Sequence, residues 1–207
     1  WFADSKKLYV QRIDRRKVEE SWLVHSLENP RPTLQTYKDP KAGDKHIPQF
    51  TLTVFDVDSR KKVDIKLEKY KDQSTRTFSA KRNGVKDSST LYFIRADRPM
   101  KHIQFCAADT TTGEVKVLLE EESHPYWNFQ FTQAHILKGG KEFIWWSERD
   151  GYGHFYLYNG KGKLIRRLTR GTYVAGRIMK VDEAKRLVYF LAFGKEKNID
   201  PYYFLYY

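Results

Sequence analysis

Apolar residues in this chain of 207 residues alternate with polar ones over short runs, and they rarely recur at the three- and four-residue spacing of a helix. Most runs end at Gly, Asn, Asp or Pro, which favour turns. The pattern therefore predicts a succession of short β-strands. The clearest lie at residues 8–13, 50–57, 63–67, 90–96, 103–108, 115–119, 143–147, 154–158, 164–169, 187–193 and 202–207.

Three dipeptides between these runs predict hairpin turns: Gly139-Gly140, Asp150-Gly151 and Asn159-Gly160. Two segments fit the pattern less well. Residues 18–27 could form a helical turn followed by a strand. Residues 29–48 hold four prolines and predict an extended excursion outside the core.

A strand, a polar turn and a second short strand recur three times along the chain. The three turns open at Asp56, Asp109 and Asn159, which are 53 and 50 residues apart. A period of about 40 to 50 residues with four short strands is typical of β-propeller blades. One blade cannot bury both of its faces, so blades stack around an axis.

We therefore expect an all-β fold built from four-stranded antiparallel blades, as a partial, open propeller of about four blades. A β-sandwich with coincidental spacing is the alternative, and three matched repeats disfavour it. The chain starts at Trp1 rather than Met and holds too few blades for a ring, so we expect it to be a fragment of a longer protein.

Composition narrows the function classes. Hydrophobic residues make up 40% and charged residues 31%, which excludes a disordered chain, and no apolar run predicts a membrane span. The single cysteine, Cys106, excludes an internal disulfide and a four-cysteine zinc site. The net charge of +12 raises the possibility of nucleic-acid binding, but the basic residues are scattered. We expect no nucleic-acid partner, no metal and no cofactor.

Hydrolase chemistry has no visible motif here. The chain contains neither Gly-x-Ser-x-Gly nor His-Glu-x-x-His, and its six histidines are dispersed. The acidic clusters 19–20 and 120–122 are expected to be exposed charge at strand ends, since neighbouring residues of a strand point to opposite faces. The aromatic residues Tyr126, Trp127 and Phe129 are the candidate substrate-binding residues. They either line a cavity between blades or fill the blade interface.

The segment 147–173 carries a pattern that resembles the β-propeller of dipeptidyl peptidase IV, in the prolyl oligopeptidase family of serine peptidases. Its elements are Ser-Glu-Arg-Asp-Gly at 147–151, the strand 154–158 and Leu-Thr-Arg-Gly at 168–171. The opening Trp-Phe-Ala-Asp-Ser, the proline-rich 29–37 and Phe-Ile-Trp-Trp-Ser at 143–147 are similar to bacterial members. The resemblance covers essentially all 207 residues.

The resemblance implies that the chain is part of one N-terminal propeller domain and that the C-terminal α/β-hydrolase domain is absent. Such enzymes release N-terminal dipeptides with Pro or Ala second. Their Ser, Asp and His would lie beyond Tyr207, and their amine-binding glutamates before Trp1, so Glu19 and Glu20 are not those glutamates. The segment Tyr126–Phe129 aligns with one that approaches the primed side of the cleft in family members, although Gln130 stands where the family has Arg.

These implications predict a non-catalytic region that gates and selects peptide substrates for a hydrolase domain, in a periplasmic or secreted protein that could form a homodimer. A standalone propeller scaffold that binds a protein or a glycan is the alternative. A third hypothesis, nucleic-acid binding through the positive charge, requires clustered basic residues and steep salt dependence.

Overall fold

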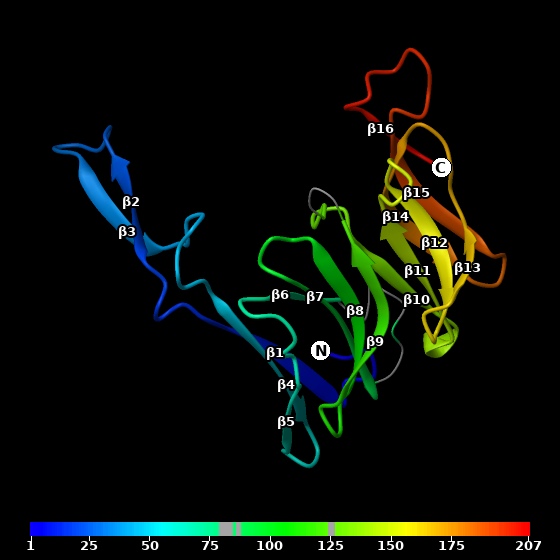
Figure 1. Ribbon diagram of the computed structural model, residues 1–207, viewed down its shortest axis with the longest axis horizontal. Coiled ribbons are helices and arrows are strands. Elements are labelled where there is room, and N and C mark those ends of the chain that lie inside the picture. The colour runs from blue at the N-terminus through cyan, green and yellow to red at the C-terminus, as the bar shows by residue number, and fades with distance from the viewer. Residues whose placement is uncertain (79–84, 86–87, 124–126) are drawn as a thin grey trace.

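The computed structural model describes residues 1–78, 85, 88–123 and 127–207, and these form five antiparallel sheets (Figure 1). Four sheets follow one another along the chain as blades. The first blade has the strand order β1-β4-β5, the second β6-β7-β8-β9, the third β10-β11-β12-β13 and the fourth β14-β15-β16. A separate two-stranded sheet, β2-β3, lies between β1 and β4 in sequence. The expected partial propeller of about four blades is confirmed.

The strands have the following bounds. The first blade contains β1 (Lys7–Asp14), β4 (Gln49–Asp56) and β5 (Lys62–Asp64), and the separate hairpin contains β2 (Glu20–His25) and β3 (Thr33–Lys38). The second blade contains β6 (Ser74–Thr77), β7 (Thr90–Ala96), β8 (His102–Asp109) and β9 (Val115–Glu122). The third contains β10 (Ala134–Leu137), the 3-10 turn η1 (Lys138–Gly140), β11 (Glu142–Ser147), β12 (His154–Asn159) and β13 (Leu164–Arg167). The fourth contains β14 (Val174–Asp182), β15 (Leu187–Phe193) and β16 (Phe204–Tyr206).

The central strands are apolar at nearly every position because both of their faces are covered. In β11, Phe143 and Trp145 pack toward the second blade, whereas Ile144 and Trp146 pack toward the fourth. The same alternation in β7 divides its side chains between the first and third blades. Successive side chains of a strand point to opposite faces, so one continuous apolar strand supplies two separate blade interfaces.

Three hydrophobic clusters fill the blade interfaces. The middle cluster, between the second and third blades, is rich in aromatic rings, including the stacked pair Phe143 and Tyr158 at 5.1 Å between ring centroids. Each fully buried aromatic side chain contributes about 2–3 kcal/mol through area removed from water. The core therefore lies between the blades rather than inside any one sheet.

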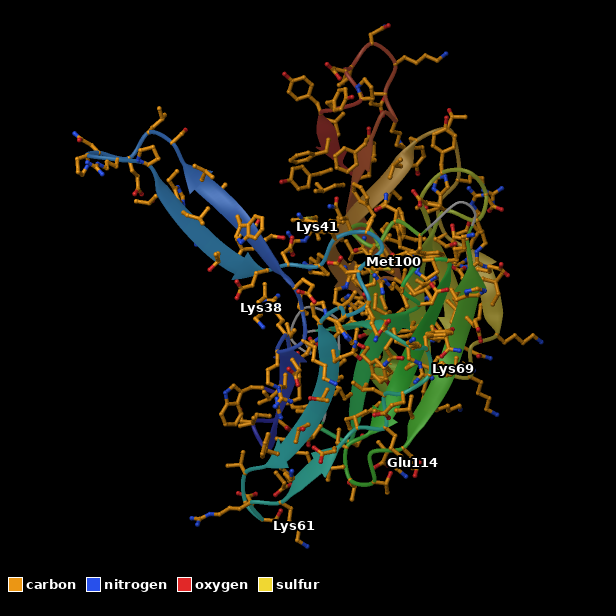
Figure 2. The ribbon with its side chains drawn as sticks, turned by 60° about the vertical axis from the view of Figure 1, so that its left-hand side comes forward. Lys38, Lys41, Lys61, Lys69, Met100 and Glu114 are labelled. Atoms are coloured by element: carbon orange, nitrogen blue, oxygen red, sulfur yellow. The ribbon has the colours of Figure 1, made fainter. Side chains whose placement is uncertain are left out.

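The predicted repeat is also a repeat in three dimensions. The side-chain oxygens of Asp56, Asp109 and Asn159 each accept hydrogen bonds from backbone N–H groups of the turn that follows. These bonds satisfy turn donors that no strand would pair. Lys61 and Glu114 mark two of these turns, which lie at the same end of the molecule (Figure 2).

Each of the later two turns packs against the outer strand of the preceding blade through a glycine. Gly113 (φ +76°) meets the backbone of Asp64, and Gly162 (φ +86°) meets the backbone of Leu118. A Cβ at either position would overlap the facing carbonyl oxygen. The positive φ and the close approach both require glycine here.

The β2–β3 hairpin projects away from the blades (Figure 1). All of β3 and most of β2 is exposed, with Trp22 69% and Leu27 97% accessible. The helical turn considered for residues 18–27 does not form, because β2 pairs with β3 over its whole length. The extended excursion predicted for 29–48 is confirmed outside the core, although it contains a strand.

The eleven strands predicted from the pattern are all present, with ends displaced by a few residues. Four strands were missed: β3, and the first strand of each of the later blades, β6, β10 and β14. β2 lies where a strand was expected to follow a helical turn within residues 18–27. β6 and β10 have only four residues each, the pairing of β14 is interrupted by register shifts, and one edge of each of the three strands is unpaired. They therefore lack the two-sided apolar pattern that marks a central strand.

Candidate functional site

The candidate residue Trp127 lies between the second and third blades. It is 6% exposed, and its ring lies 6.2 Å from that of Trp145. Its Nε1 donates a hydrogen bond to Oγ1 of Thr132, which in turn donates to the backbone oxygen of Asn128 at 2.8 Å. The backbone N–H of Trp127 donates to the carbonyl of Met100 at 2.6 Å. The segment is therefore tied to both blades by its backbone and by its ring.

Phe129 is half-buried and packs on the edge of the same aromatic cluster. The guanidinium of Arg76, on β6, lies 4.6 Å from the centre of its ring, a cation–π contact. Arg76 also donates to the carbonyl of Phe129 at 2.7 Å and to that of Thr132. Burial lowers the pKa of Arg76 from its ordinary value. One arginine of the second blade thus fixes the loop that leads into the third.

The third candidate, Tyr126, lies outside the described residues. The sequence left two possibilities for these aromatic residues, lining a cavity or filling the blade interface, and Trp127 does both. Its ring packs into the blade interface, and it also lines a hollow of about 400 Å³ together with Glu121, Glu148 and Arg149. The structure therefore brings the aromatic segment together with charged groups that the sequence did not place beside it.

Glu121 and Arg149 form an ion pair across the second and third blades. The Glu121 side chain is only 10% exposed, and its second oxygen accepts a hydrogen bond from Nε1 of Trp145 at 3.1 Å. Arg149 is further held by Oγ of Ser147 at 3.0 Å and lies 4.5 Å from the ring centre of Tyr156. The expectation of exposed acidic charge at 120–122 therefore fits Glu120 and Glu122, whereas Glu121 is on the opposite, covered face of β9.

Glu148 is the carboxylate that the third blade contributes to this hollow, whose lining also includes Glu120 and Glu122. Burial raises its pKa above the ordinary value, and a hydrogen bond from Asn128 offsets part of that increase. Asn128 therefore links Glu148 to the aromatic segment. The Ser-Glu-Arg-Asp-Gly motif could have indicated this site, because Glu148 and Arg149 come from its centre. Glu121, the ion-pair partner of Arg149, carries no sequence signal beyond its acidic neighbours.

Two groups with potential chemistry are held as structural residues. The single cysteine, Cys106, is buried in β8, and burial raises the pKa of its thiol to about 12, so its thiolate is not formed near neutral pH. The His154 ring is fully buried, and its two nitrogens contact Oγ1 of Thr169 and the carbonyl of Gly171, both at 3.0 Å.

Within the part of the chain that the structure describes, no three His, Cys, Asp or Glu side chains gather in a way that could hold a metal ion. Over the same residues, the only helix is one 3-10 turn, and no helix has the length and apolar character needed to cross a membrane.

The model of the dipeptidyl peptidase IV (DPP IV) N-terminal region family matches residues 1–207. The chain belongs to this family. It is also similar to a solved structure of a putative dipeptidyl aminopeptidase IV from Bacteroides ovatus, at 22% identity and a TM-score of 0.78. A second similar structure is dipeptidyl peptidase 4 from Porphyromonas gingivalis, at 25% identity and a TM-score of 0.78.

The similarity covers 93% and 95% of this DPP IV N-terminal region chain but only 29% and 27% of the two solved chains. The chain therefore spans less than a third of the length of either relative. The resemblance deduced from the motifs around 147–173 is confirmed by the family match. Because the match is confined to this part of the relatives, their activity, substrates and partners are not assigned to this chain.

Proposed function

We propose that this DPP IV N-terminal region is the non-catalytic, substrate-gating wall of a serine peptidase of the prolyl oligopeptidase family. The peptidase would remove dipeptides from peptide N-termini, with Pro or Ala in second position. In this proposal residues 1–207 are part of one propeller domain, and a separate α/β-hydrolase domain supplies the Ser, Asp and His. The observation that carries the proposal is the family match over the whole chain.

The contacts of the aromatic segment support a role in gating. Phe129 is only half-buried, and it is held by Arg76 from a neighbouring blade. Because its position is already fixed, such a side chain loses little conformational entropy when a peptide binds against it. It can therefore restrict the shape of the peptides that pass. Phe129 would then contact substrate residues on the leaving-group side of the scissile bond.

The proposal is tested by comparing the full-length protein with chain 1–207 on Gly-Pro and Ala-Pro reporter substrates. The full-length protein should release dipeptides, and the chain alone should release none. In the full-length protein, Phe129→Ala should raise KM for a longer peptide and leave KM for the dipeptide reporter unchanged. Tyr202→Ala, at a residue 89% exposed on the fourth blade, is the matched control. Turnover by the chain alone, or equal effects on both substrates, would contradict the proposal.

We also propose a second copy of the protein as a partner, contacted by the β2–β3 hairpin. Trp22 and Val24 lie on one face of that hairpin and are 69% and 61% exposed, and Leu34 pairs with Val24 beside them. A projecting apolar hairpin with unpaired edges favours association.

Replacement of Trp22 and Val24 by Ser should convert a dimer to a monomer in sedimentation equilibrium of the full-length protein. Ile199→Ser together with Tyr202→Ser removes exposed apolar area elsewhere and should leave the dimer intact. A wild-type protein that sediments as a monomer would overturn this part of the proposal. The periplasmic or secreted location is a further proposal, tested by fractionating cells that produce the full-length protein.

A further inference from the structure

The first strands of three successive blades surround one large hollow. Each of β6, β10 and β14 is the edge strand of its sheet, and residues of all three line a space of about 1050 Å³. In a propeller the blades are arranged around a central channel. This space, which we call the inner hollow, is therefore the channel side of the second, third and fourth blades.

The charged lining of the inner hollow is entirely basic. Among the described residues, its titratable side chains are Arg76, His135, Arg177 and Lys180, and no carboxylate lines it. Arg76 is occupied by the carbonyls of Phe129 and Thr132. Arg177 and Lys180 are exposed, and neither forms an ion pair with any described residue. These two side chains leave positive charge available to a ligand.

The position of Arg177 is fixed by a bulge in β14. The pairing of β14 with β15 shifts between Ala175 and Ile178, which places Arg177 in the irregular stretch. The side-chain amide of Gln133 spans this stretch. Its Nε2 donates to the carbonyl of Gly176 at 2.7 Å, and its Oε1 accepts from the N–H of Ile178 at 2.9 Å. A bulge re-aims a side chain, and here a residue of the third blade holds it in place.

The remaining lining combines uncharged polar side chains with apolar ones. Phe131, Ile178 and Phe193 contribute to the hollow, and Phe131 stacks on Trp146 with ring centroids 5.8 Å apart. A small inorganic anion would gain nothing from these surfaces. A peptide with carboxylates can use both the basic and the apolar parts, because charge-assisted hydrogen bonds and burial of apolar area then act together.

We propose that the inner hollow is a binding site for acidic peptides, in which Arg177 and Lys180 bind carboxylates while Phe131 and Phe193 contact the apolar parts of the chain. This inference rests on the proposed function in that peptides must reach the propeller channel. It adds a preference for acidic residues downstream of the released dipeptide. The carboxylates can belong to Asp or Glu side chains or to the end of the peptide.

The test measures binding rather than turnover, so it does not depend on peptidase activity. Fluorescence anisotropy of the full-length protein is recorded with a labelled peptide of Glu and Leu residues whose N-terminus is acetylated, so that no dipeptide can be released from it during the measurement. The same peptide is prepared with Gln in place of Glu, and each form with a free and an amidated C-terminus. The Glu peptide should bind about tenfold more tightly than the Gln peptide, because each cation gains about one carboxylate contact.

The double variant Arg177→Gln and Lys180→Gln should bind the Glu peptide about tenfold more weakly and the Gln peptide unchanged. Its matched control is Lys163→Gln with Arg166→Gln, which removes the same charges from the turn before β13 and from β13 itself and should bind like the wild type. A difference confined to the free and amidated forms would assign the site to the chain end. Higher salt should reduce the preference for Glu.

Wild-type binding that is equal for the Glu and Gln peptides and also equal for their free and amidated forms would overturn the inference, as would an equal loss in the control variant. Tighter binding of a single-stranded oligonucleotide than of the Glu peptide would also overturn it, in favour of a nucleic-acid site. If reporter turnover is absent but the charge-dependent binding is present, the proposed peptidase function fails and the acidic-peptide site stands. If turnover is present without that binding, the reverse holds.

Discussion

Phe105 of β8 and Trp145 of β11 stack across the interface between the second and third blades, with ring centroids 5.4 Å apart and planes 29° from parallel. Both rings are fully buried, and Phe105 also contacts Tyr92, Phe78 and Phe143. One side chain of the second blade thus meets two side chains of the third.

Phe105→Ala is expected to lower the free energy of unfolding by about 3–5 kcal/mol, because it removes a buried ring and leaves a cavity. Urea denaturation followed by tryptophan fluorescence measures the change. Tyr202→Ala, at an exposed residue, should stay within about 0.5 kcal/mol of the wild type. A comparable loss in both variants would mean that the ring stack is not a centre of stability.

Arg149→Met should destabilise the protein by about 2–3 kcal/mol, because it leaves the covered Glu121 carboxylate without its counter-ion. Adding Glu121→Gln to this variant should recover most of the loss, since the amide carries no charge and can still accept from Trp145. A double-mutant cycle by urea denaturation measures the coupling. Lys62→Met, in the exposed pair with Asp64, is the control and should change little. Additive effects of the two changes would contradict the pairing.

His154 should make the fold less stable in mild acid. Burial lowers its pKa below the ordinary 6.5, so the unfolded chain takes up a proton at a higher pH than the folded chain. Its contribution to stability is therefore present above about pH 6.5 and is lost as the pH falls through the folded-state pKa. His154→Phe should flatten the decline in melting temperature between about pH 7 and about pH 5.

For His102, the expected dependence of stability on pH has the opposite sign. The hydrogen bond from its ring to Asp97 raises its pKa, so its stabilising effect is present below about pH 6.5 and is lost as the pH rises through the folded-state pKa. His102→Gln should therefore lower the melting temperature at acidic pH more than at neutral pH. Parallel pH profiles for the two variants would contradict these assignments.

Gly162→Ala should destabilise the fold by more than the cost of a positive φ alone. The new Cβ would overlap the carbonyl oxygen of Leu118 in the neighbouring blade. Gly43→Ala has a similar φ of +92° and no atom within 4 Å, so it isolates the conformational cost of about 1 kcal/mol. The difference between the two melting temperatures measures the turn-to-blade contact. Equal effects of the two substitutions would show that the backbone around Leu118 shifts to accommodate the new Cβ without a measurable loss of stability.

The sequence predicted the central strands because both of their faces are buried, and it predicted the three turns because Asp56, Asp109 and Asn159 accept bonds from their own turns. It missed β6, β10 and β14, which are edge strands that face the inner hollow. β6 and β10 are only four residues long, and register shifts interrupt the pairing of β14. The hairpin β2–β3 was only partly foreseen, because it is stabilised by its own pairing and buries little.

In the candidate site, too, the sequence indicated only the residues that have a recognisable local pattern. Trp127 and Phe129 were found because aromatic residues between blades are conspicuous. Arg76, Glu121 and Arg149 were not, since each is an ordinary charged residue until folding brings together parts of the chain that are far apart in sequence. Arg177 depends on a bulge that is held by a residue of another blade, and no local pattern encodes that position.

The alternation of side chains in β11 limits how this region can change in length. Phe143 and Trp145 serve one blade interface while Ile144 and Trp146 serve the other, so inserting one residue within the strand would exchange the two sets at once. Insertions and deletions should therefore be confined to the turns and to excursions such as the hairpin after β1. Related proteins can be expected to diverge in length at those places while their blade strands keep a constant register.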